Sequence, residues 1–138
     1  MANHEKRFSV LPERMPAPPL EQLNEAQKKV AADLIATRGK LQGPFMATIR
    51  SPKLADRMQQ LGAFIRYECS LELRINRLVS LMVARHWSAQ YEWNGAVTLA
   101  LKAGLKQAVI DAIAENRRPE NMAEDEIIVY EFIRDRKS

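Results

Sequence analysis

The stretch Ala84-Arg85-His86-Trp87-Ser88-Ala89-Gln90-Tyr91-Glu92-Trp93-Asn94, followed ten residues later by Gly104, decides how this chain folds. It joins two segments whose apolar residues recur every three or four positions, which is the spacing of a helix that buries one face. Gly104 suits the left-handed backbone conformation at which many helices end. We therefore expect two long helices here, the second of which carries a carboxylate, Glu92, between two aromatic side chains.

The size and composition of the chain are those of one globular domain. Its 138 residues, of which 46% are hydrophobic, suffice for a core without a cofactor or a disulfide. No window approaches the ~18 apolar residues of a membrane span, and residues 1–10 lack the apolar stretch of a signal peptide. Cys69 is the single cysteine, which fits a reducing compartment. We expect a soluble, cytoplasmic protein.

Charge and motif content exclude several functions. The net charge is +4, but the basic residues are scattered or interleaved with acids, as at Lys28-Lys29, Arg117-Arg118 and the tail around Arg134, which is a poor nucleic-acid footprint. The two histidines, His4 and His86, have no metal-ligand spacing, and the isolated glycines form no phosphate loop. We therefore predict no metal, no cofactor, no nucleic acid and no membrane among the partners.

Prolines and helical periodicity divide the chain further. Residues 1–19 contain four prolines and should form an extended arm, because a proline disfavours helix in the residue before it. Residues 20–138 should form one helical domain. We expect an all-α bundle of about six helices, at 20–38, 52–70, 71–86, 88–103, 106–115 and 123–135.

Capping residues and apolar stripes give the expected details of these helices. Gly39 should end the first helix, and Ser51-Pro52 should open the second. Ser70 and Ser88 should cap the next two. The third helix has a wide apolar face and should be central. The residues expected to face inward are Leu54, Met58, Leu61 and Ile65 in the second helix, and Leu71, Leu78, Leu81 and Met82 in the third.

Two titratable side chains of the opening stretch are candidates for chemistry. Glu92, between Tyr91 and Trp93, could be partly desolvated, which suits a general acid or base; alternatively it is a surface or ion-paired glutamate. His86, near the end of a helix, could shuttle protons, or it could cap carbonyls or pack on an aromatic ring. Cys69 is flanked by glutamates that disfavour a thiolate, so we expect it to be a packing residue.

Short motifs along the chain occur in the order of a known family: Gly43-Pro44-Phe45, Arg50-Ser51-Pro52, Leu61-Gly62, Val83-Ala84-Arg85, Tyr91-Glu92-Trp93 and Ala103-Gly104-Leu105. With Ala112-Ile113-Ala114, Arg118-Pro119-Glu120 and the segment 126–132, they make residues 43–133 resemble the carboxymuconolactone decarboxylase family, which shares its fold with the alkyl hydroperoxidase D peroxidases. The resemblance implies an all-helical domain that assembles into dimers, trimers or hexamers, with a site between two core helices.

The chain departs from this family at the positions that carry its chemistry. In the peroxidase branch two cysteines lie where this chain has Ala89 and Glu92, so disulfide-based peroxidase chemistry is excluded at this site. Relatives with Tyr-Glu-Trp place a histidine at the position of Ala96 and an Arg-Glu pair at the position of Asn76-Arg77. An altered or degenerate site is therefore favoured over that of a standard decarboxylase.

Two functional classes remain open. In the first, the chain is an enzyme that moves a proton on a small carboxylated lactone or keto acid, with Glu92 as acid or base and Arg77 as anchor of a substrate carboxylate. His86 or Tyr91 would assist. In the second, Arg77 and Glu92 form a closed ion pair and the chain is a non-catalytic binding or scaffold protein. A cavity lined by both residues would favour the first class, and contact within about 4 Å the second.

The resemblance also bears on assembly. The Tyr-Glu-Trp relatives continue with further helices after the segment that matches Tyr130–Ile133, whereas this sequence stops at Ser138. Apolar surface left uncovered in this way would be covered by neighbouring subunits or by the arm. We therefore expect a homo-oligomer, with a small carboxylated compound as its possible ligand.

Overall fold

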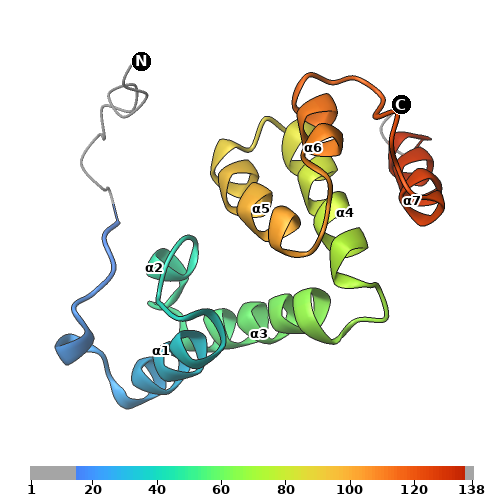
Figure 1. The fold of residues 1–138 in the computed structure, drawn as a ribbon. Coiled ribbons are helices and arrows are strands. Elements are labelled where there is room, and N and C mark those ends of the chain that lie inside the picture. The colour runs from blue at the N-terminus through green and yellow to red at the C-terminus, as the bar shows by residue number, and fades with distance from the viewer. Residues whose placement is uncertain (1–14, 136–138) are drawn as a thin grey trace. The chain divides into compact units, whose positions relative to one another are not determined.

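Residues 15–135 are described by the computed structural model, and within this range every regular element is a helix (Figure 1). The predicted all-α class is confirmed, with seven α-helices among these residues where about six were expected. Each of the helices in this range is too short or too polar to span a lipid bilayer. Of the predicted arm, residues 15–19 contain no helix or strand, and the rest lies outside the described residues. Contacts divide the chain into two compact units, Met1–Ile65 and Arg66–Ser138.

From residue 15 onward, the first unit contains a short 3-10 turn, Leu20–Gln22, followed by α1 (Glu25–Arg38), α2 (Phe45–Thr48) and α3 (Pro52–Ala63). The first α-helix begins at Glu25 rather than at Leu20, because Asn24 caps it. The Asn24 side chain accepts a hydrogen bond from the backbone N–H of Gln27, and the Gln27 side chain accepts one from that of Asn24, each at 2.9 Å. Gly39 ends α1 with a φ of 80°, as predicted.

Helix α3, which corresponds to the second of the predicted helices, opens at Pro52, directly after Ser51 as predicted. It buries a different face from the one expected. Three residues predicted to face inward are exposed, and that prediction is wrong for Leu54, Leu61 and Ile65. The buried residues are Ala55 and Gln59, and α3 packs against α1. The small side chain of Ala55 allows a close approach of helices, which the spacing of large apolar residues does not reveal. After Ala63 the chain continues as a π-helix, Phe64–Glu68.

The second unit is built around α4, which packs against each of the other three helices (Figure 1). Its helices are α4 (Leu73–His86), α5 (Gln90–Lys102), α6 (Gln107–Ala114) and α7 (Glu124–Asp135). The predicted inward residues of α4 are buried in the cases of Leu78, Leu81 and Met82. Leu71 is exposed, because α4 begins only at Leu73 and not at Ser70. The predicted central position of this helix is therefore correct.

Three helices of the second unit end in the same way, with one residue of positive φ that turns the chain. These residues are Ser88 after α4 (φ 51°), Gly104 after α5 (φ 90°) and Asn116 after α6 (φ 58°). In each case the next N–H donates back to a carbonyl of the last helical turn, as Ala89 does to Ala84 at 2.8 Å. The prediction that Ser88 begins α5 is therefore wrong, since Ser88 ends α4 instead.

An ion-pair cluster fixes the beginning of α7 to the beginning of α4. Arg74 binds Glu126 through one of its terminal nitrogens. Its other terminal nitrogen lies 2.5 Å from a carboxylate oxygen of Asp125. The second oxygen of Glu126 accepts from the backbone N–H of Ala123 at 2.8 Å. The pKa of Arg74 is raised, mostly by the hydrogen bond that Arg74 donates to Asp125 and next by the one that it donates to Glu126. In turn, Arg74 lowers the pKa of Asp125. Although the Glu126 side chain is only 3% exposed, both of its oxygens are satisfied.

Candidate functional site

Glu92, the predicted acid or base, lies in the first turn of α5 and is exposed. No hydrogen bond or ion pair joins its carboxylate to another residue within 15–135. Of its aromatic neighbours, Tyr91 is 62% exposed and Trp93 is half-buried. These rings therefore leave Glu92 in water, and its role in proton transfer stays a prediction.

Arg77, the predicted anchor, lies on α4 and is buried, with 5% of its surface exposed. Burial lowers the pKa of its guanidinium; Tyr67 acts in the opposite direction, and Arg66 lowers this pKa further. Within residues 15–135 its Nε has no hydrogen-bond partner, and no ion pair joins it to Glu92. The closed ion pair is thus absent, and the two candidate side chains occupy different environments, one buried and one in water.

His86 occupies the last turn of α4, where it is exposed. Its ring meets that of Trp87 edge to face, with centroids 5.2 Å apart and an angle of 84° between the planes. Packing on an aromatic ring was one of the alternatives that the sequence left open. His86 also lines a cavity, to which Arg77, Tyr91 and Glu92 do not contribute. Of the candidate residues, His86 is therefore the one that leads to a possible binding site.

This cavity, which we call the basic cavity, has a volume of about 250 Å³ and belongs to the second unit. Its polar lining comes from the ends of α4, α6 and α7 and comprises Arg85, His86, Asn116, Arg117 and Arg134. Its apolar lining consists of the core residues Met82, Ile113 and Tyr130. Among residues 15–135, no aspartate or glutamate lines it. The lining of the basic cavity thus combines positively charged side chains with apolar ones.

The three arginines of the basic cavity are held in different ways. Arg85 donates through Nε to the carbonyl of Ala114 at 2.8 Å, which connects the end of α4 to the end of α6. Arg117 pairs with Glu115 at 2.5 Å, and about three-fifths of each side chain is exposed, at 57% and 60%. Arg134, in the last turn of α7, has no hydrogen bond or ion pair to any residue that the structure describes. One guanidinium is therefore oriented, one is weakly paired and one is unpaired.

A second cavity, of about 310 Å³, shares Arg85 with the basic cavity. Its other lining residues are Ala84, Ser88, Gln90, Trp93 and Ala114. It thus includes the tryptophan of the Tyr91-Glu92-Trp93 motif but neither Glu92 nor Arg77. The single basic residue in its lining gives it much less charge than the basic cavity has.

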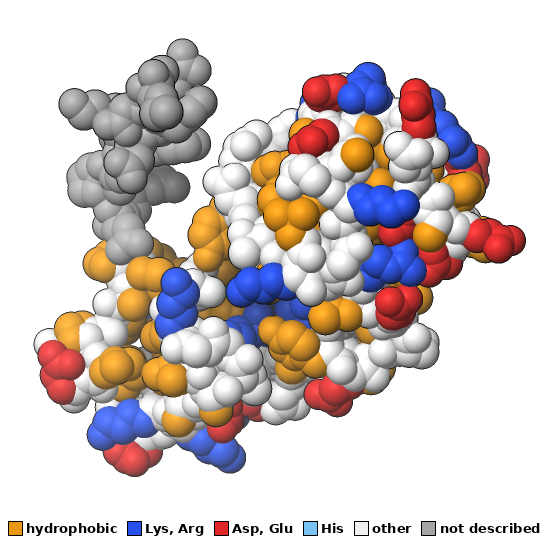
Figure 2. Space-filling view, viewed as in Figure 1, with side chains coloured by type: hydrophobic (Ala, Val, Ile, Leu, Met, Phe, Trp, Pro, Cys, Tyr) orange, Lys and Arg blue, Asp and Glu red, His pale blue; other side chains and the backbone are white. Residues whose placement is uncertain are grey.

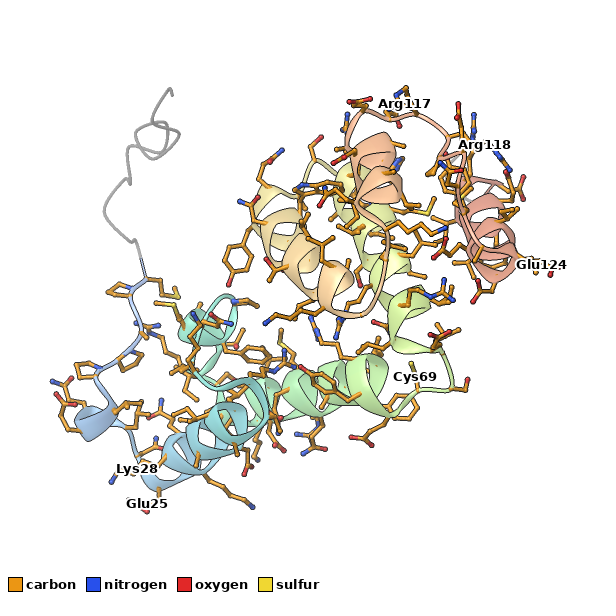
Figure 3. All side chains as sticks on the ribbon, in the orientation of Figure 1. Glu25, Lys28, Cys69, Arg117, Arg118 and Glu124 are labelled. Atoms are coloured by element: carbon orange, nitrogen blue, oxygen red, sulfur yellow. The ribbon has the colours of Figure 1, made fainter. Side chains whose placement is uncertain are left out.

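Sequence reasoning missed the basic cavity because its arginines lie far apart in the chain. The pair Arg117-Arg118 lies on the connection between α6 and α7 (Figure 3), and Arg134 belongs to the basic tail, so two of the clusters that sequence inspection found do contribute. Nothing in their spacing indicated that they meet Arg85. The face of the molecule in Figure 2 carries both basic and acidic side chains.

Comparison with known proteins adds no further assignment: no family model, no curated protein and no solved structure matches this chain. Within residues 15–135, no group of histidine, cysteine, aspartate or glutamate side chains is placed to hold a metal ion. The chemical interpretation of the site therefore depends on the geometry of its own residues.

Proposed function

We propose that this chain is a carboxymuconolactone decarboxylase-like protein with an altered site, and that it acts by binding a ligand rather than by decarboxylation. The observation that carries this proposal is the difference in environment between Arg77 and Glu92. Arg77 is buried and Glu92 is exposed to water, and no hydrogen bond or ion pair joins them, so they are not arranged as a positioned acid/base pair that holds one small substrate.

The residue one helical turn after Glu92, Ala96, supports the same conclusion. Ala96 lies one turn further along α5, where the Tyr-Glu-Trp relatives are expected to carry a histidine. In this chain Ala96 is 9% exposed and packs in the core of the second unit with Leu78 and Val109. Apolar packing occupies the place of the imidazole, so Glu92 has no partner to exchange a proton with on this face.

We predict that substitution of Glu92 leaves the rate of decarboxylation unchanged, because the intact chain does not catalyse that reaction. Carboxymuconolactone and acetoacetate are the appropriate substrates, since one is the lactone of the family and the other a simple keto acid. We expect the intact chain and its Glu92→Gln variant to decarboxylate both at the uncatalysed rate. Turnover by the intact chain that falls by about a hundredfold or more in Glu92→Gln would overturn the proposal, because that is the usual contribution of a general acid or base.

We also propose that the protein works as a homo-oligomer. Ile128 and Phe132 lie one turn apart on α7 and are 65% and 59% exposed, although both are large and apolar. Such side chains on one helix face favour association of identical subunits. The double variant Ile128→Glu, Phe132→Glu should therefore lower the mass measured by sedimentation equilibrium, whereas Lys102→Glu, an exposed change on α5, should not. A monomeric intact chain would refute the oligomer.

A further inference from the structure

The basic cavity combines three guanidinium groups with an apolar wall, and neither the predicted acid nor the predicted anchor contributes to it. We propose that it binds a small organic dianion, which is a compact apolar body that carries either two carboxylates or one phosphate group. This inference does not depend on the family assignment or on the loss of acid/base chemistry. It concerns a different set of residues, at the ends of α4, α6 and α7.

The charge of the lining requires an anionic ligand. Arginine recognises carboxylate and phosphate groups through two parallel N–H donors, and Arg134 presents its whole guanidinium with no partner among the described residues. The carbonyl ends of α4, α6 and α7 lie beside the cavity, and each contributes about half a negative charge. The carboxylate of Glu115, which pairs with Arg117, brings the opposing charge to about two and a half negative charges. The three arginines still exceed this, and no acidic residue among those the structure describes lines the cavity.

Two of the arginines are prepared for a ligand in complementary ways. The bond from Arg85 Nε to the Ala114 carbonyl, at 2.8 Å, fixes the orientation of its guanidinium, while its terminal nitrogens have no partner within residues 15–135. Such orientation before binding lowers the entropy lost when a ligand binds. Arg117 is held only by its exposed pair with Glu115. Because exposed pairs contribute at most about 1 kcal/mol, a ligand anion can replace Glu115 there.

The apolar wall and the volume define the rest of the ligand. Met82, Ile113 and Tyr130 are 4%, 5% and 7% exposed and belong to the core, so they form a fixed surface. A body that rests against these three side chains is apolar. The volume of about 250 Å³ falls below the range of roughly 300–1,000 Å³ that is typical of sites for drug-sized ligands. The cavity therefore fits a small organic acid rather than a nucleotide.

Four probes test this proposal: isophthalate and phenyl phosphate, which are aromatic dianions, benzoate, which carries one charge, and inorganic phosphate, which has no apolar body. Titration calorimetry at about 0.15 M salt limits nonspecific attraction. We expect at least one aromatic dianion to bind about tenfold more tightly than benzoate, as one additional charge-assisted pair provides. It should also bind more tightly than inorganic phosphate. Binding of isophthalate alone assigns a dicarboxylate, and binding of phenyl phosphate alone assigns a phosphate monoester.

The variants Arg134→Gln and Arg117→Gln locate the binding site. Each removes one exposed guanidinium from the cavity, and each should weaken binding about tenfold. The matched control is Arg57→Gln, which makes the same charge change on α3, outside the cavity, and should have no effect. Thermal unfolding of each variant confirms that it is folded, and either cavity variant suffices if the other does not fold.

Proton NMR adds a measurement at the cavity itself. The chain has two histidines, and the His86→Gln variant identifies which ring resonance belongs to His86. We expect a saturating aromatic dianion to shift the His86 resonance. The proposal is overturned if neither dianion binds below about 10 mM, if inorganic phosphate binds as tightly as both of them, or if Arg57→Gln weakens binding as much as Arg134→Gln does.

Discussion

Single residues at the helix ends hold the second unit in its shape. Ser88 and Asn116 have φ values of 51° and 58°, in the left-handed region, which costs most L-residues roughly 1–2 kcal/mol. Asparagine tolerates this region better than serine does, and glycine has no penalty there. Ser88 is thus the more strained of the two. It is nevertheless the residue that turns the chain from α4 into α5, two residues after the histidine of the basic cavity.

Replacement of Ser88 by glycine is therefore expected to stabilise the protein by about 1 kcal/mol. Gly104, at the equivalent position after α5, provides the converse test. A Cβ added there would meet nothing within 4 Å, so Gly104→Ala should cost about 1 kcal/mol from its φ of 90° alone. Urea unfolding with an unchanged m value measures both effects. A destabilised Ser88→Gly variant would mean that the serine side chain, rather than its φ, decides the stability here.

Among the helices, sequence periodicity was informative where a helix is surrounded. Leu78, Leu81 and Met82 were correctly placed in the core, because α4 contacts three neighbours and a wide apolar stripe leaves only one choice of face. The same reasoning failed for α3, where large apolar residues such as Leu54 are exposed and Ala55 is buried. Periodicity tells which residues share a face, but not which face another helix covers.

The attachment of α7 to α4 depends on a cluster that periodicity cannot reveal. Replacement of Arg74 by methionine should destabilise the protein by about 3 kcal/mol, since it leaves the buried carboxylate of Glu126 without its cation. Arg118→Met is the matched control: it breaks the pair with Glu131, in which the side chains are 49% and 50% exposed, and should cost less than about 1 kcal/mol. Equal losses in the two variants would refute a special role for the Arg74 cluster.

The same variant has a predicted dependence on pH. Arg74 holds the pKa of Asp125 below its ordinary value of 3.8, so the pair stabilises the folded state fully above that pH. As the pH falls through the lower pKa of the folded state, Asp125 becomes protonated and this stabilisation is lost. The difference between the intact chain and Arg74→Met should therefore become smaller in acid. A difference that stays constant between pH 6 and about 2.5 would contradict this assignment.

Across the whole chain, the sequence predicted the class of fold and some of the residues of the site, but not the place where the charges meet. The all-α class followed from the local spacing of apolar residues, and His86 was singled out as a candidate. Arg85, Arg117 and Arg134 come together only because α4, α6 and α7 end near one another. A net charge of +4 and a scattered pattern of basic residues could not indicate a cavity with three of them.

In the proposal made above, ligand recognition depends on the basic cavity and not on Glu92. The most direct measurement is the affinity for isophthalate and phenyl phosphate of the intact chain, Glu92→Gln and Arg134→Gln, determined side by side by titration calorimetry. Glu92→Gln should bind the preferred dianion as the intact chain does, while Arg134→Gln should bind it about tenfold more weakly. The opposite result, in which Glu92→Gln changes the affinity and Arg134→Gln does not, would contradict the claim.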